Sequence, residues 1–564
     1  MTSQKELLRQ LADASGQKQL LTHQDDKAWY TRGFRVGQGE ALAVVLPLTL
    51  QALWKTLQVC VAHDAIVLMQ ASNTGVTGGS TPDGSDYDRD VIIISTRRLK
   101  GVQVIDDNRQ VIAFPGTTLT ELEQTLQPLG REPHSVIGSS CIGASVVGGV
   151  CNNSGGSLIR RGPAFTEKSL FARIHDDGRL EMVNHLGIDL GETPEAMLDN
   201  LTRQQYRTGD RPDWQGKIWA DDYADRLRDV DADSPARFNG DLRYLHDSAG
   251  SAGKVVVFAV RLPTFAASAG SETFYMGSND ERELVALRRF LLTRMSELPQ
   301  QAEYIHRGAF DMTVRYAKHM YLAIRRLGPQ AIPRLMANKA KWDIRVGHLK
   351  LLPRNAVDRA LQLFNQLTPA FVAPRIMAWR DGYEHHLMIK VESAQADELQ
   401  ALLAEFFRER SGDFFRCDAR EAADAFLVRF GGGGCTISYC DALGYNPNER
   451  LVAFDVALRR NDDAWRLELP PALAAQVEVD SCCGHFFCFV NHQDYVLKED
   501  VDAGAFKAEV MAYLEQRGAK YPAEHNVGHL YHASCEHVAH WQQLDPTNSC
   551  NPGIGKTSKK KFWA

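Results

Sequence analysis

Three histidines and a glutamate in the C-terminal third are the residues whose types and spacing point most clearly to chemistry. His485 and His492 are separated by six residues, and Glu524 is followed directly by His525. Two imidazoles and a carboxylate are a common ligand set for first-row metals. A straight strand would place His485 and His492 on opposite faces, so they share a site only if a turn or bulge lies between them. The alternative is that these histidines have separate roles, each hydrogen-bonded or exposed.

Two glycine-rich loops in the N-terminal third could hold a diphosphate. The first spans residues 70–80 after an apolar run, and the second spans residues 138–149 and leads into the NNSGG sequence at 152–156. Their small residues leave backbone N–H groups open to phosphate oxygens. Neither loop has the GxGxxG spacing of a Rossmann site, and the GKTS sequence at 555–558 lacks the first glycine and following helix of a P-loop. Either loop alone could be a structural turn, but together they favour one binding site.

Length and composition place limits on the fold and on the partners. A chain of 564 residues exceeds what one hydrophobic core usually supports, so two or three domains are expected. The net charge of -6 argues against nucleic-acid binding by the molecule as a whole. Eleven irregularly spaced cysteines favour reduced thiols, and the polar N-terminus predicts no secretory signal. The longest apolar run is too short to span a bilayer, so any membrane attachment is expected to be peripheral.

The order of apolar and helical segments predicts an α+β protein with two domains. Short β-rich runs alternate with helical stretches up to about residue 262, and helix-rich sequence with occasional strands follows from about residue 280. We expect a first domain over residues 1–265, a second over 266–510, and a segment over 511–564 that returns to the first domain. The runs most typical of strands are residues 43–45, 65–68, 91–95, 255–258, 386–391 and 453–458.

A strongly basic segment, residues 314–361, lies inside the second domain. Eleven lysines and arginines in it are opposed by only two aspartates, and the residues between them include Tyr321 and Trp342. The chain also ends in the basic and aromatic sequence KKKFW at 559–563. Basic residues mixed with aromatic ones suit an anionic bilayer surface. The alternatives are a solvated basic face and a patch that binds nucleic acid, as in a non-catalytic binding protein.

The glycine loops and four longer motifs identify a family resemblance. The chain resembles the vanillyl-alcohol-oxidase superfamily, whose FAD-binding domain is of the PCMH type, and within it the bacterial quinone-dependent D-lactate dehydrogenases. The resemblance extends over nearly the whole chain. The motifs that show it are Arg131–Ser145, Asn184–Pro194, Tyr521–Leu530 and Asp545–Ser558.

The resemblance implies a PCMH-type FAD domain in two parts, with an α+β cap domain that contains the basic segment as a helical membrane-binding insertion. It also implies non-covalent FAD, because no histidine lies between Gln70 and Ser80 to tether the flavin. Gly138, Ser145 and Gly155 should line the other side of the flavin, and Val257 the adenine or ribose region. The residues expected at the diphosphate are Ala71, Ser72, Asn73, Thr74, Gly75, Gly79 and Ser80.

For the active site, the resemblance implies oxidation of D-lactate to pyruvate, with hydride passing to the flavin N5 and electrons passing to a membrane quinone. Another D-2-hydroxyacid, such as 2-hydroxyglutarate or glycolate, is the alternative substrate. His525 would be the base, because an imidazole titrates near neutral pH. The implied ligands of a Zn or Mn ion are His485, His492 and Glu524, although the apolar run between the two histidines departs from the pattern of relatives that carry the metal.

The substrate carboxylate needs a planar cationic partner, which arginine supplies with two parallel hydrogen bonds. The resemblance implies Arg380 for this role, with a second contact from His385 or His386. The alternative is that Arg380 is a surface residue paired with Asp381 or Glu384. The resemblance also implies a location on the cytoplasmic face of the inner membrane, with anionic lipid and quinone as partners and no nucleic acid.

Overall fold

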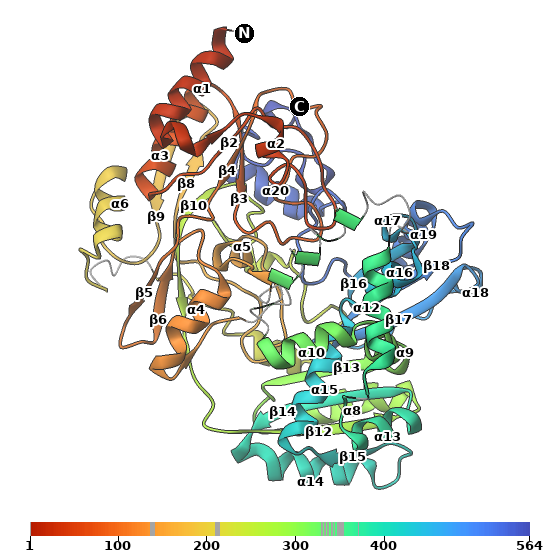
Figure 1. Cartoon of the computed structure of the whole chain (residues 1–564). Helices are drawn as coiled ribbons and strands as arrows, with labels where there is room; N and C mark the ends of the chain where they lie inside the picture. The colour runs from red at the N-terminus through yellow and green to blue at the C-terminus, as the bar shows by residue number, and fades with distance from the viewer. Residues whose placement is uncertain are drawn as a thin grey trace.

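The computed structural model describes residues 2–135, 142–208, 215–328, 331, 334–335, 338–339, 342, 345–346, 355–369 and 371–564. Within these residues the strands form sheets of four, five, two and seven strands. The N-terminal half of the chain carries the four- and five-stranded sheets, and the seven-stranded sheet lies beside them (Figure 1).

The four-stranded sheet positions the first glycine loop. Its order is β1-β2-β4-β3, with β2, β4 and β3 parallel and β1 antiparallel. Strands β3 and β4 are apolar and almost entirely buried, as is usual for parallel strands covered by helices. Helices α1 and α3 pack together beside this sheet. The elements are α1 (Thr2–Ser15), β1 (Leu20–Leu21), α2 (Gln24–Lys27), β2 (Ala43–Val45), α3 (Leu50–Ala62), β3 (Ile66–Gln70) and β4 (Val91–Ser95).

The five-stranded sheet is antiparallel and has the order β5-β6-β10-β8-β9. Strand β10 is buried along its whole length and lies at the centre of this sheet. Strands β7 and β11, which are far apart in the sequence, form a separate two-stranded antiparallel sheet. The elements are β5 (Val102–Ile105), β6 (Gln110–Ala113), α4 (Leu119–Leu126), β7 (Arg131–Glu132), α5 (Val146–Cys151), β8 (Ser169–Ile174), β9 (Leu180–Asn184), α6 (Pro194–Arg203), α7 (Tyr223–Arg228), β10 (Val256–Pro263) and β11 (Phe265–Ala266).

The seven-stranded sheet is antiparallel throughout, with the order β15-β12-β14-β13-β17-β18-β16. Because side chains alternate along each strand, its two faces bury different clusters: Tyr304 and Leu387 belong to one, Ile305 and Met388 to the other. The strands are β12 (Ser271–Ser278), β13 (Gln301–His306), β14 (His385–Glu392), β15 (Asp413–Arg416), β16 (Leu451–Ala457), β17 (Val477–His485) and β18 (Val490–Leu497).

Helices cover both faces of this sheet. Helices α8 and α14 contribute to the cluster that contains Tyr304, whereas α9, α13 and α15 contribute to the cluster that contains Ile305. The helices of this region are α8 (Glu281–Arg294), α9 (Arg307–Tyr316), α10 (Lys318–Leu327), α12 (Ala356–Leu367), α13 (Pro374–Gly382), α14 (Ala396–Phe407), α15 (Ala419–Gly432), α16 (Cys435–Leu443), α17 (Pro447–Arg450) and α18 (Pro471–Ala474).

The last part of the chain returns to the N-terminal sheets. After α19 (Ala503–Gln516) and α20 (Cys535–Leu544), residues 549–551 run alongside β3. The Val67 N–H donates to the Ser549 carbonyl at 2.8 Å, and the Asn551 N–H donates to the Val67 carbonyl at 2.9 Å. In Figure 1 the blue α20 accordingly lies among the red N-terminal elements.

The expected strands at residues 43–45, 65–68, 91–95, 255–258, 386–391 and 453–458 correspond to β2, β3, β4, β10, β14 and β16. The predicted domain limits at 265 and 510 stay a prediction. In the described part of the chain, no helix is both long enough and apolar enough to cross a bilayer.

Candidate active site

His485 and His492 lie on the two strands of one hairpin. Strand β17 ends at His485, β18 begins at Val490, and the turn between them includes Phe489 at a φ of 55°. His492 is the cross-strand partner of Cys483, two residues before His485, so both imidazoles face the same side of the sheet. The ring centroids are 5.3 Å apart. The structure thus contains the turn that a shared site requires.

Glu524 completes a group of three that could hold a metal ion. Each residue offers one ligand atom, and the three ligand atoms of His485, His492 and Glu524 all lie within 4.8 Å of one another. The segment that carries Glu524 contacts the N-terminal half of the chain, because the Gly155 N–H donates to the Glu524 carbonyl oxygen at 3.4 Å. A Cβ atom at Gly155 would lie 2.5 Å from Glu524 Oε1, so glycine is required there. Two imidazole nitrogens and a carboxylate oxygen fit the donor set of a zinc or manganese ion.

Buried charges surround this group and raise the pKa of His485. His485 Nδ1 lies 2.8 Å from Glu303 Oε1, and His485 Nε2 lies 3.1 Å from Glu524 Oε2. Burial lowers the pKa of His485, but the two carboxylates outweigh it and raise the pKa to about 10. Arg429 pairs with Glu303 at 2.9 Å, and Arg237 pairs with Glu524. Each buried charge therefore has an opposite partner, as stability requires.

Asp455 connects His492 to His525. Its Oδ1 lies 3.2 Å from His492 Nδ1 and its Oδ2 lies 2.7 Å from His525 Nδ1. The Glu524 N–H also donates to Oδ2 at 2.7 Å. Desolvation opposes the charged carboxylate, but the two imidazoles outweigh it and keep the pKa of Asp455 well below its usual range. Asp455 therefore stays ionised and fixes the orientation of both rings.

His525 is the most accessible of the three histidines. Its side chain is 40% exposed, compared with 24% for His492 and 11% for His485. Desolvation lowers its pKa, but Asp455, followed by Glu524, raises it by more, so the net shift is upward. Because Nδ1 faces Asp455, Nε2 is the nitrogen that can accept a proton from a substrate.

Glu303 and Asp455 were not among the site residues predicted from the sequence. Both are charged residues inside largely buried strands, with Glu303 in β13 and Asp455 in β16. A carboxylate in such a strand is uncommon unless it has a partner, and this is the one sequence feature that could have revealed them. Their partners are set by strand register, which pairs Glu303 with His485 and Asp455 with His492.

Arg380, His385 and His386 lie outside this group. Arg380 is on α13 and pairs with Asp311 and Asp381, neither of which contacts the three histidines. Burial lowers the pKa of His386 to about 3, and its ring packs near Tyr275 and Phe310 with no hydrogen-bond partner in the described structure. The predicted role of these residues at the substrate carboxylate stays a prediction, and the observed pairing of Arg380 with Asp381 matches its alternative.

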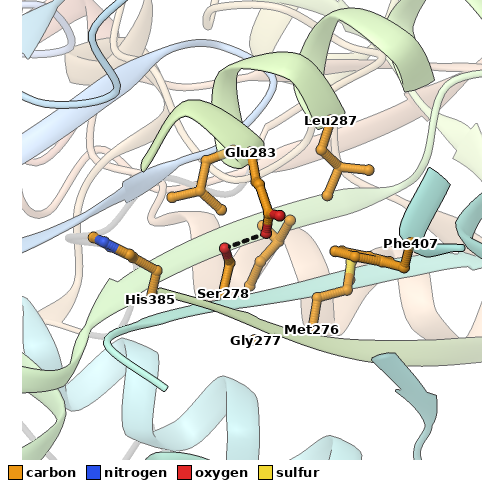
Figure 2. A pocket seen from close by; sticks show the side chains of 9 residues that line it. Met276, Gly277, Ser278, Glu283, Leu287, His385 and Phe407 are labelled. Carbon is orange, nitrogen blue, oxygen red and sulfur yellow. Dashed lines mark hydrogen bonds between the residues drawn. The ribbon is translucent and has the colours of Figure 1, made fainter. Parts of the chain in front are cut away.

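His385 lines a separate small pocket on the opposite face of the sheet. Its Nδ1 lies 2.9 Å from the Tyr304 hydroxyl. The pocket has a volume of about 10 Å³, room for roughly one water molecule, which is too small for a 2-hydroxyacid. Figure 2 shows His385 at one side of it and Phe407 at the other, with the Ser278 hydroxyl donating to Glu283 between them at 2.6 Å.

The first glycine loop follows β3 and is held at several points. The Asn73 side chain donates to the Arg32 carbonyl at 2.8 Å and accepts from the Ser80 hydroxyl at 3.1 Å. Gly79 is held by Asn551, whose amide donates to its carbonyl at 2.9 Å. A Cβ at Gly75 would meet nothing within 4 Å, so this part of the loop faces open space.

The loop fits an FAD diphosphate. The hydroxyls of Ser72 and Thr74 have no protein hydrogen-bond partner among the described residues, and both residues are half-buried beside Ala71. Unpartnered hydroxyls next to a glycine with open space above it are suitable phosphate contacts.

The remaining residues predicted at FAD lie on different elements. Ser145 caps α5, accepting a hydrogen bond from Gly148 N at 3.0 Å, and Val257 is buried in β10 opposite Phe171. Gly155 is in contact with Glu524, which places the second glycine cluster next to the histidine group. Gly138 lies outside the described residues.

Helix α12 begins inside the basic segment and continues past its end, where it exposes an apolar face. On α12, Leu363, Phe364 and Leu367 are 56%, 46% and 76% exposed, and their spacing places them on one side of the helix. Helix α10 contacts α12 and ends at Leu327, which is 55% exposed. The exposed arginines of the segment are Arg315, Arg325, Arg326, Arg334, Arg345 and Arg359.

The basic C-terminal tail has a different environment. Lys559 pairs with Asp83 at 3.2 Å and with Asp86 at 2.7 Å, and Lys561 pairs with Asp64 at 2.9 Å. Trp563 packs on Lys254, whose Nζ lies 4.2 Å from the ring centroid. The tail is therefore bound to the N-terminal half of the chain, which does not favour the expectation that it binds lipid.

The family models and the curated relatives that match this chain indicate the same family. A family described as "D-lactate dehydrogenase, membrane binding" matches residues 273–563, and one described as "FAD binding domain" matches residues 41–166. The chain is 50% identical to the quinone-dependent D-lactate dehydrogenase of Escherichia coli (strain K12), covering 100% of this chain and 98% of that protein. It is 46% identical to that of Haemophilus influenzae (strain Rd), covering 100% of both.

Solved structures support the fold alone. A p-cresol methylhydroxylase with substrate bound aligns with a TM-score of 0.60 at 11% identity, over 99% of this chain and 98% of that one. An alkyldihydroxyacetonephosphate synthase aligns with a TM-score of 0.55 at 11% identity, over 97% and 84%. Together with the FAD-binding family match, they confirm the predicted fold, a PCMH-type FAD domain with an α+β cap domain. By its full-length identity to curated relatives, the chain belongs to the family of quinone-dependent D-lactate dehydrogenases.

Proposed function

We propose that this protein oxidises D-lactate to pyruvate with FAD as its cofactor and a membrane quinone as the electron acceptor. The observation that carries the proposal is the histidine and carboxylate group, which contacts the second glycine cluster through Gly155 and Glu524 in a chain of this family. A catalytic base beside a flavin-binding loop is what oxidation of a 2-hydroxyacid requires.

FAD, when bound, supplies the acceptor for the hydride that leaves the substrate Cα. Ser72, Thr74 and Gly75 would hold its diphosphate, and Gly155 and Ser145 would line its other side. No histidine lies in the loop of residues 70–80, which supports non-covalent binding.

His525 takes the hydroxyl proton of the substrate at Nε2. Asp455 holds Nδ1, so the ring presents Nε2 to the open side of the group and stays basic. The imidazolium that results is stabilised by the same carboxylate. When the Cα hydride and the hydroxyl proton have both left, the 2-hydroxyacid has become a 2-oxoacid.

His485, His492 and Glu524 would hold a divalent zinc or manganese ion, which would supply a Lewis acid for the substrate hydroxyl. Glu303 and Asp455 support this assignment, because carboxylates on the Nδ1 atoms of two ligand histidines direct the Nε2 atoms inward.

The basic segment would bind an anionic lipid surface, on the cytoplasmic side of the membrane. An apolar helix face beside exposed arginines supports this, because the apolar side chains can enter the acyl region while the arginines meet phosphates. The variant Leu363→Ser/Phe364→Ser/Leu367→Ser should bind vesicles of phosphatidylglycerol and phosphatidylethanolamine at least about tenfold more weakly, since each buried apolar side chain contributes roughly 1.5–3 kcal/mol. Leu242→Ser, an exposed leucine of the N-terminal half, is the matched control, and equal binding by both variants would exclude the α12 face.

The visible spectrum of the purified protein tests the proposed function. Under anaerobic conditions, D-lactate should bleach the flavin bands and L-lactate should not. If neither lactate isomer bleaches the flavin but D-2-hydroxyglutarate or glycolate does, the substrate is that alternative 2-hydroxyacid. A colourless protein that cannot be reconstituted with FAD would contradict the proposal.

A further inference from the structure

Arg35 lies at the tip of a short loop that precedes the first glycine loop in the sequence. The loop is closed by the Gly33 N–H, which donates to the Gly37 carbonyl at 2.8 Å, and by a bridge between Arg32 and Gln38. Within the described structure, the Arg35 side chain has no ion pair or hydrogen bond, and the residue is exposed.

Close backbone packing places this loop at the edge of the active site. A Cβ at Gly37 would lie 2.9 Å from Gly78 Cα, so the loop packs directly on the first glycine loop. The neighbouring Thr77 packs in turn on Gly528, where a Cβ would lie 2.0 Å from the Thr77 carbonyl oxygen. Gly528 is three residues after His525, so the two glycine contacts fix the Arg35 loop relative to the base.

The charge of the Arg35 guanidinium is consistent with the position that the glycine contacts give to its loop. It acts on His525, where it opposes the stronger upward effect of Asp455 on the pKa. It also acts on Asp494, two residues after His492 in β18. Arg35 is therefore within electrostatic range of the accessible imidazole and of the strand that carries a proposed ligand.

The two arginines that pair with carboxylates of the histidine group, and the predicted carboxylate ligand Arg380, already have ionic partners. Arg237 is buried with Glu524, and Arg429 is buried with Glu303. Arg380 is engaged by Asp311 and Asp381. A 2-hydroxyacid brings one negative charge to the site, and of these four arginines only Arg35 has no carboxylate within ion-pair distance among the described residues.

We propose that Arg35 binds the carboxylate of the 2-hydroxyacid substrate at the entrance of the active site. With the carboxylate on the guanidinium, the adjacent hydroxyl can face His525 Nε2. A guanidinium holds a carboxylate with two parallel hydrogen bonds, which also fixes its orientation. The inference rests on the proposed function, since it assigns the substrate contact of that same site.

The test uses the full-length holoenzyme and three variants, Arg35→Ala, Arg35→Lys and Arg32→Ala. Arg32 is an exposed arginine in the same loop and serves as the matched control. Oxalate, a dicarboxylate that cannot be oxidised here, is titrated into the oxidised enzyme and followed by the shift of the flavin bands. The KM and kcat for D-lactate and the FAD content are measured on the same preparations.

We expect Arg35→Ala to weaken oxalate binding and raise the KM for D-lactate by about 10- to 100-fold, because a charge-assisted hydrogen-bond pair is lost. Arg35→Lys should recover part of the loss, FAD content should be unchanged, and Arg32→Ala should behave like the unaltered enzyme. Unchanged oxalate binding and KM in Arg35→Ala would overturn the proposal, and so would loss of FAD from that variant, which would assign Arg35 to the cofactor phosphates. Failure of the unaltered holoenzyme to be reduced by D-lactate would instead contradict the proposed function.

Discussion

Two pairs of histidines lie in the same seven-stranded sheet, and they differ in whether carboxylates lie beside their rings. His485 and His492 have buried carboxylates on their ring nitrogens, and the carboxylates Glu303 and Glu524 raise the pKa of His485 to about 10. Among the described residues, no carboxylate lies at hydrogen-bond distance from His385 or His386, and burial lowers their pKa values to about 4 and about 3.

The difference shows that residue type alone does not mark the site. All four imidazoles are in or beside strands, and two of them are adjacent in the sequence. What separates the pairs is whether strand register brings a carboxylate opposite the ring. His485 and His492 face the segment of Glu524 and the glycine cluster. The neutral pair, His385 and His386, is buried among aromatic rings or beside a one-water pocket.

The largest expected effect comes from breaking the buried charge network. Glu524→Ala would leave Arg237 and His485 without a shared carboxylate, and we expect a loss of about 3–5 kcal/mol in the free energy of unfolding. The measurement is the shift of the urea unfolding midpoint. Glu478→Ala is the control, because Glu478 pairs with Arg450 at a more exposed position of the same hairpin, where an ion pair contributes at most about 1 kcal/mol. Equal shifts in the two variants would show that the buried charge network contributes no more to the free energy of unfolding than the exposed ion pair does.

Removing the negative charge of Asp455 should reduce catalysis while the fold persists. In Asp455→Asn, the amide can still contact His525 and His492 but no longer fixes their orientation as an ionised acceptor, so turnover should fall about 10- to 100-fold. The same variant should retain less zinc or manganese than the unaltered protein, measured by elemental analysis after dialysis. Turnover and metal content within a factor of two of the unaltered enzyme would show that Asp455 has no role in catalysis or metal binding.

The smallest expected effect concerns the neutral pair and depends on pH. The folded-state pKa of His386 lies near 3, below that of an unfolded histidine near 6.5, so the unfolded chain binds the extra proton between these values. Stability should therefore fall as pH decreases from about 6.5 towards 3. His386→Leu should weaken this dependence and gain about 1 kcal/mol at neutral pH, since a buried imidazole without a partner is removed. Denaturant unfolding at pH 7 and pH 5 measures the gain in stability and its dependence on pH. If the free energy of unfolding changes with pH equally in the variant and the unaltered protein, His386 is not a neutral buried histidine.

The fold class and the main strands could be predicted from the sequence, because apolar runs and motifs are local features. The spacing of the histidines left open whether they share a site, and the family resemblance alone indicated the group that the structure brings together. The sequence did not reveal Glu303 or Asp455, because their pairing with His485 and His492 depends on strands that are far apart in the chain. It also could not separate Arg35 from Arg380, since an arginine that is free to bind a carboxylate differs from a paired one only in its folded surroundings. The role of the C-terminal lysines depended likewise on aspartates more than 400 residues away in sequence.

Flavin reduction by D-lactate in the His525→Asn variant shows whether this histidine removes the substrate proton. In an anaerobic stopped-flow experiment with FAD bound at the unaltered level, we expect a rate of reduction about 10²- to 10⁴-fold lower than in the unaltered enzyme, which is the usual contribution of a general base. A rate within a factor of about three of the unaltered enzyme would contradict the assignment of this histidine group as the site of D-lactate oxidation.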